Sequence, residues 1–102
     1  MFYHLVMMRL TGLDAGFHAR VSSFVTRIRT ELPYVRAYHF GPNVASGAKE
    51  FRWAALAVFD SSADHDRYEV SNVHQELKAF MAAHIADIIV CDFDAMKDRD
   101  DE

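Results

Sequence analysis

The spacing of apolar side chains predicts a strand followed by a long helix in the first third of the chain. Residues 2–10 are rich in β-forming side chains, and both alternating sets of positions are largely apolar, as in a strand covered on both faces. After a glycine, apolar side chains recur at helical spacing, which predicts an amphipathic helix from about Asp14 to Leu32. We expect Asp14 to cap this helix and Pro33 to end it.

The rest of the chain alternates between shorter segments of the same two kinds. Apolar, β-forming segments at 35–40, 51–60 and 87–93 predict three further strands. Between the last two, helical spacing predicts a short helix at about 61–70 and a second helical piece at about 74–86, separated by a polar turn. A polar, glycine-containing segment predicts a loop between the first two of these strands.

This order of elements, β-α-β-β-α-β, is that of the ferredoxin-like α+β fold. Such a fold has one four-stranded antiparallel sheet with its helices on one face. The length of 102 residues is typical of one domain, which we place at 1–94, followed by an acidic C-terminal tail at 95–102.

The predicted sheet has one face without helices, and strict alternation makes that face apolar. Its side chains are Tyr3, Leu5, Met7, Tyr38, Phe40, Leu56, Val58, Ile89, Cys91 and Phe93. Because nothing in a monomer covers this face, we expect a symmetric homodimer. Two sheets would pack face to face into a dimeric α+β barrel.

Three alanines of the predicted sheet lie beneath the helices, and their small size predicts a pocket there. His4, His39 and Asp92 would be its polar lining. Trp53 and Phe24 are the aromatic candidates for contact with a ligand. The alternative is that bulky phenylalanines, Phe24 included, fill the same space.

Composition and charge narrow the class of partner. Hydrophobic residues make up 51% of the chain, and a single cysteine excludes an internal disulfide, which fits a reducing, cytoplasmic setting. The net charge of −4, with no basic stripe, argues against nucleic-acid binding. The N-terminal apolar run is too short to span a bilayer and lacks the features of a signal peptide, so we expect no membrane association.

Four segments carry a resemblance to a known family. They are FYHLVMMRL at 2–10, LPYVRAYHFGPNV at 32–44, AVFDSSADHDRYEVSNVHQEL at 57–77 and IIVCDFD at 88–94. Together they resemble the stress-responsive A/B barrel domains (Dabb) over essentially the whole chain. The resemblance implies a dimeric α+β barrel, in line with the uncovered sheet face.

A plant polyketide cyclase of this family closes a linear tetraketide without a metal or cofactor, and the resemblance implies where its working residues fall here. Two of these positions are His74, at the mouth of the last predicted helix, and Tyr68, six residues before it. The other two are His4 in the first strand and Asp92 in the last strand. Two departures stand out: Ser71-Asn72 stands in place of the usual His-Pro, and Trp53 in place of a third-strand histidine. The cyclase substrate is therefore not carried over.

In such a site His74 would act as the general base and Asp92 would orient its ring. Tyr68 or His4 would donate a hydrogen bond to the developing oxyanion. The structural alternative is that His74 only fixes the turn before its helix. No pair of histidines and acids has a recognised metal-binding spacing, so we predict no metal and no cofactor.

Two functions of different classes follow. In the first, the protein is a homodimer that binds a small hydrophobic or polyketide-like molecule without turnover. In the second, it is a cofactor-free cyclase or lyase with His74 as general base. A heme-dependent monooxygenase on a related barrel is disfavoured, because no histidine is clearly placed as an axial ligand.

Overall fold

A computed structural model of the chain describes residues 1–97 and confirms the ferredoxin-like α+β fold. Its elements are β1 (Phe2–Leu10), α1 (Phe17–Glu31), β2 (Val35–Pro42), β3 (Trp53–Phe59), α2 (Ser62–Glu69), α3 (Asn72–Ala82) and β4 (Ile85–Asp94). Most of the predicted acidic tail, residues 98–102, lies outside the described residues.

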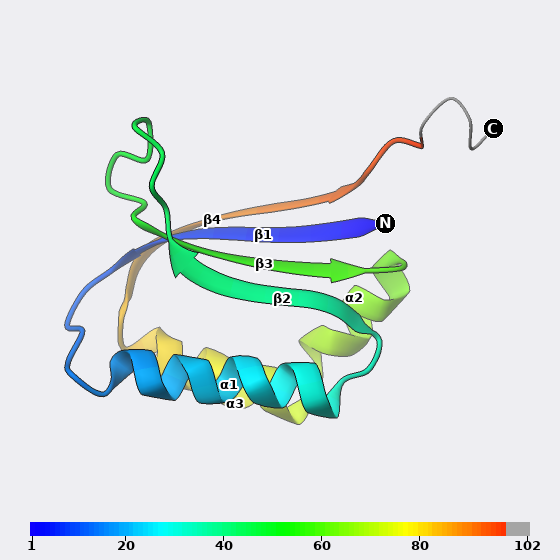
Figure 1. Cartoon of the computed structure of the whole chain (residues 1–102), viewed down its shortest axis with the longest axis horizontal. Coiled ribbons are helices and arrows are strands. Elements are labelled where there is room, and N and C mark those ends of the chain that lie inside the picture. Colours follow the sequence, from blue (N-terminus) through cyan, green and yellow to red (C-terminus); the bar gives the residue numbers. More distant parts are fainter. Residues whose placement is uncertain (98–102) are drawn as a thin grey trace.

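The four strands form one antiparallel sheet in the order β2-β3-β1-β4. All three helices lie on one face of this sheet, with α1 and α3 side by side along it and α2 near the end where the chain begins (Figure 1). In this strand order β1 lies inside the sheet, between β3 and β4. Its side chains on the covered face lie beneath the helices. β4 is an edge strand.

The starts of the three helices show which side chains act as caps. α1 begins at Phe17, later than predicted, and Asp14 does not cap it: its carboxylate accepts the backbone N–H of Gly16, in the turn before the helix. α2 and α3 begin after Ser61 and Ser71, whose hydroxyls accept backbone N–H groups of the first turn. No helix in the described part of the chain is long and apolar enough to cross a membrane.

The core lies between the sheet and the helices. Its most deeply buried large side chains are Tyr68, Phe17, Phe59, Ile28 and Val73. Burying a side chain of this kind contributes about 1.5–3 kcal/mol, so these residues hold the helices to the sheet. Ala55 and Ala57 lie beneath the helices, as predicted. The third predicted alanine, Ala37, pairs with Val58 and lies on the open face instead.

A β-bulge between Val35 and Ala37 reverses the predicted faces of β2. The extra residue shifts the alternation by one position, so Tyr38 and Phe40 lie on the helix-covered face and His39 on the open face. We predicted the reverse for all three. Strict alternation from the start of the strand cannot anticipate an inserted residue.

The open face of the sheet is otherwise as predicted. Cross-strand pairing places one set of apolar side chains together on it: Tyr3, Leu5, Met7, Leu56, Val58, Ile89, Cys91 and Phe93. Ile89 and Phe93 are 43% and 46% exposed, and the Phe93 ring stacks on Tyr3. No helix of the described chain lies over this face (Figure 1).

Candidate functional site

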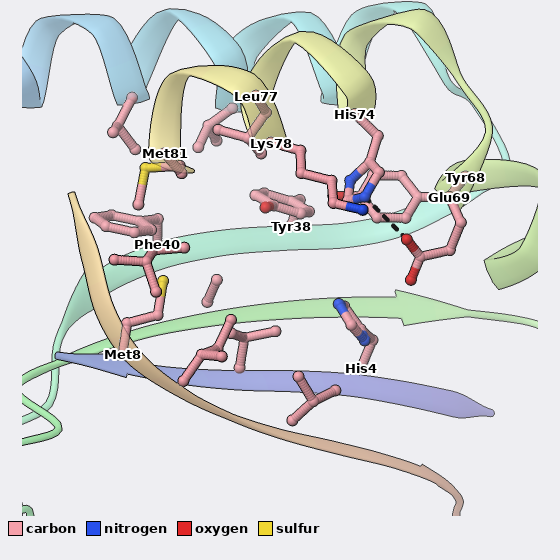
Figure 2. A pocket seen from close by; sticks show the side chains of 17 residues that line it. His4, Met8, Tyr38, Phe40, Tyr68, Glu69, His74, Leu77, Lys78 and Met81 are labelled. Atoms are coloured by element: carbon pink, nitrogen blue, oxygen red, sulfur yellow. Dashed lines mark ion pairs between the residues drawn. The ribbon is translucent and has the colours of Figure 1, made fainter. Parts of the chain in front are cut away.

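A cavity of about 240 Å³ lies between the sheet and the helices. One end, the polar end, is formed by His4, Tyr68, Glu69 and His74. The other, the apolar end, is formed by Met8, Phe40, Ala55, Met81 and Ile85. In Figure 2, Met8, Phe40 and Met81 lie on one side of the cavity and the polar end lies on the other, with Tyr38 between them and Lys78 reaching toward His74.

The side of the cavity along β4 is open. Ile88 and Val90 line the cavity and are nevertheless 43% and 52% exposed. They belong to an edge strand, so no further strand shields them. A ligand therefore has a route into the cavity along this strand.

His74 lies in the first turn of α3, where the Ser71 hydroxyl accepts its backbone N–H. Its side chain is 14% exposed, and its Nε2 is 2.9 Å from a carboxylate oxygen of Glu69 (Figure 2). Its Nδ1 is buried and has no hydrogen-bond partner within residues 1–97. An ionised Glu69 favours a proton on Nε2, which leaves the lone pair of Nδ1 free.

His4 and Asp92 form a second histidine–carboxylate pair. They are direct cross-strand partners in β1 and β4, and His4 Nδ1 donates a hydrogen bond to Asp92 Oδ1 at 2.5 Å. The histidine is 13% exposed and the aspartate 35%. The sheet register itself sets this pairing, since opposed residues of neighbouring strands point to the same face.

The predicted pairing of Asp92 with His74 is therefore wrong. Asp92 is bound to His4, and Glu69 is the carboxylate beside His74. Glu69 ends α2 and is separated from α3 only by a short turn, which brings its side chain to the first turn of the next helix. Sequence reasoning did not select Glu69, although its position just before the turn was visible.

Tyr68 is almost completely buried, and its ring lies 4.4 Å from the ring of His74, centroid to centroid. Burial raises the pKa of its hydroxyl far above the usual range, and the nearby hydroxyl of Tyr38 raises this pKa further. Tyr68 therefore stays protonated and is a hydrogen-bond donor at any physiological pH.

Burial lowers the pKa of His74 below its usual value, and the nearby side chains of Lys78 and His4 act in the same direction. Glu69 opposes this effect by favouring the imidazolium. The net lowering keeps the ring neutral near pH 7. A neutral histidine with a free nitrogen can accept a proton or a hydrogen bond.

His65 lies behind the polar end of the cavity, and sequence reasoning missed it. It is 7% exposed and packs between the rings of Phe2, His4 and Phe59. Its Nε2 lies 2.9 Å from the second carboxylate oxygen of Glu69. The sequence feature that could have indicated this contact is the i, i+4 spacing of His65 and Glu69, which places both side chains on one face of the helix.

The three predicted ligand contacts lie outside this cavity. Phe24 belongs to the core, where its ring packs on Phe80. His39 is exposed and accepts a hydrogen bond from Arg29. His39 and Trp53 line a separate hollow between α1 and β2.

Comparison with protein families gives one assignment. Residues 2–95 match the family described as Stress responsive A/B Barrel Domain, Dabb. The chain therefore belongs to the Dabb family, as its sequence segments indicated. Comparison with curated proteins found no match.

Solved structures share the fold. A dimeric ferredoxin-like protein of unknown function from Jannaschia sp. CCS1 is 25% identical, with a TM-score of 0.78 over 92% of this chain and 98% of that one. A protein of Arabidopsis thaliana is 13% identical, with a TM-score of 0.81 over 95% and 97% of the two chains. A hydroxynitrile lyase from Passiflora edulis is 18% identical, with a TM-score of 0.77 over 90% of each chain.

Proposed function

We propose that this protein binds a small hydrophobic molecule in the cavity between its sheet and its helices. One observation carries the proposal: a cavity of about 240 Å³ that is apolar along most of its walls and polar at one end. Apolar walls supply affinity, and a few polar groups orient the ligand. This volume is below the roughly 300–1,000 Å³ of pockets for drug-sized ligands, which favours a small ligand.

The test replaces Ala55, whose small side chain leaves space at the apolar end. Ala55→Leu fills that space from the sheet side. Binding of 1-aminoanthracene, a compact apolar fluorophore, is measured by fluorescence titration. We expect the variant to bind it at least about tenfold more weakly, which is about 1.4 kcal/mol of binding free energy.

Ala19→Leu is the matched control, because Ala19 is exposed on α1 and is not among the residues that line the cavity. It adds the same side-chain volume outside the cavity and should bind the fluorophore as the wild type does. Equal affinity in all three proteins, or no binding by the wild type, would contradict the proposal. Circular dichroism of each variant verifies that it is folded.

We further propose that the protein is a homodimer formed through the open face of the sheet. The apolar side chains on that face support this, as does the description of structural neighbours as dimeric. Leu56→Asp places a carboxylate in the centre of the face and should convert the dimer to a monomer, because burying an unpaired charge is costly. Light scattering measures the mass, and a monomeric wild type at micromolar concentration would refute the dimer.

A second candidate is acid–base catalysis of the lyase or cyclase type, favoured by the buried, unpartnered Nδ1 of His74. In an aldol cyclisation Nδ1 takes a proton from a carbon acid, and the carbanion attacks a carbonyl carbon of the same molecule. In cyanohydrin cleavage Nδ1 takes the hydroxyl proton, the C=O bond forms and cyanide leaves with the electrons of the C–C bond. In both cases Glu69 at Nε2 stabilises the imidazolium that forms. The Passiflora edulis neighbour is itself described as a lyase. Wild type and His74→Ala are compared on β-polyketide thioesters and aromatic cyanohydrins. Equal product yields would exclude His74 as the base.

A further inference from the structure

Three groups that bind metals meet behind the polar end of the cavity. One ligand atom from each of His4, His65 and Glu69 lies within 4.8 Å of the other two. The imidazole rings of His4 and His65 are 4.6 Å apart, centroid to centroid. β1 supplies the first of these residues and α2 the other two, so the cluster exists only where this helix packs on the sheet.

We propose that His4, His65 and Glu69 bind a divalent transition-metal ion of the zinc class. This goes beyond the proposed binding of a hydrophobic molecule and does not depend on it. Two imidazoles and one carboxylate form a donor set that holds Zn²⁺ while leaving a coordination position free. Imidazole donors also favour Zn²⁺, Co²⁺ and Ni²⁺ over Mg²⁺ and Ca²⁺.

His65 is the strongest evidence for the site. Its side chain is 9% exposed, and its Nε2 is buried without a hydrogen-bond partner within the described chain. That nitrogen is only 2.9 Å from Glu69 Oε1, but the two do not form an aligned hydrogen bond. A buried polar atom left unsatisfied destabilises the folded chain, and a metal ion bound between the two groups removes this cost.

Two of the three proposed ligands are held in place by a neighbouring side chain, as metal ligands commonly are by residues that do not touch the metal. Asp92 accepts a hydrogen bond from His4 Nδ1, which leaves Nε2 of that ring as its metal-binding atom. Figure 2 shows the His4 ring rising from β1 toward the helices, on the same side of the cavity as Glu69. His74 lies 2.9 Å from Glu69 Oε2 and so fixes the carboxylate from its other side.

The distances suit a tetrahedral ion after small side-chain rotations. Bonds of about 2.0–2.1 Å at tetrahedral angles place ligand atoms roughly 3.3 Å apart. The distance from His65 Nε2 to Glu69 Oε1, 2.9 Å, is slightly shorter than this. The upper limit on the separation of any two of the three ligand atoms, 4.8 Å, is longer. His4 and Glu69 both line the cavity, so an ion held by them would lie next to its polar end.

The test titrates Co²⁺ and Zn²⁺ into the full, untagged chain after treatment with a chelator. We expect Co²⁺ to produce the visible absorption of a tetrahedral site and Zn²⁺ to abolish it by displacement. Glu69→Gln keeps the side-chain shape and removes the charge, and His65→Gln removes the buried nitrogen donor. Each variant should bind Zn²⁺ at least about tenfold more weakly, as measured by calorimetry. Tenfold is the lower end of the loss of metal affinity that follows mutation of a residue that only hydrogen-bonds to a metal ligand.

His39→Gln is the control, because His39 is an exposed histidine away from the cluster. It should bind Zn²⁺ as tightly as the wild type. The site is refuted if the wild type binds neither ion, if Glu69→Gln binds as well as the wild type, or if His39→Gln weakens binding equally. Glu69 is half-exposed, so its variant should fold even if His65→Gln does not.

Discussion

The polar and apolar ends of the cavity share two elements, β1 and α3, and differ in the other elements that contribute to them. β1 supplies His4 to one end and Met8 to the other, four residues apart on the same face of the strand. α3 likewise supplies His74 to one end and Met81 to the other. Only the polar end also receives side chains from α2, so this short helix turns an apolar cavity into one that can orient or hold a polar group.

The two ends should also differ in what they contribute to stability. Phe17 lies behind the apolar end, where it is 1% exposed and stacks on Phe80. Phe17→Ala should lower the free energy of unfolding by about 3–5 kcal/mol, because it leaves a cavity in the core. Glu69→Gln at the polar end should cost less than about 1 kcal/mol, since its ion pairs are partly exposed. Urea denaturation measures both, and equal losses would show that the ends do not differ in this way.

An intermediate effect should come from the buried tyrosines. Tyr68→Phe removes the hydroxyl that interacts with Tyr38 and leaves the latter without that partner. We expect a loss of about 1–3 kcal/mol in the free energy of unfolding. The double variant Tyr38→Phe/Tyr68→Phe should cost less than the sum of the two single changes. Strict additivity in urea denaturation would mean that the hydroxyls do not interact.

The polar end should also make the free energy of unfolding depend on pH, through His74. Burial lowers the pKa of folded His74 below 6.5, so its contribution to stability is complete above pH 6.5 and is lost as the pH falls through the folded-state pKa. One such group changes the free energy of unfolding by at most about 1.4 kcal/mol per pH unit. Denaturation of metal-free protein from about pH 7.5 to about pH 5.5 measures this slope.

His74→Gln should give a shallower slope than the wild type, because the group that titrates is gone. Met81→Leu, a change of similar volume at the apolar end, should keep the wild-type slope. An unchanged slope in His74→Gln would assign the pH dependence to other groups.

The order of elements and the family were readable from the sequence, because both depend on local signals. Apolar periodicity distinguishes strands from helices, and Ser61 and Ser71 mark the starts of two helices. The inward face of β1 was also readable, since His4 lies in an unbroken strand. Beyond the β-bulge in β2 the same rule failed, and it misplaced Tyr38, His39 and Phe40 together.

The sequence by itself determined the fold and brought His4, Tyr68, His74 and Asp92 forward as candidates. Only the tertiary structure decided which carboxylate meets which histidine: Asp92 meets His4, and Glu69 meets both His74 and His65. The physical reason is that strand register and the docking of α2 on the sheet set these distances. Residues far apart in the chain, such as His4 and His65, become neighbours through packing, which leaves no regular spacing in the sequence.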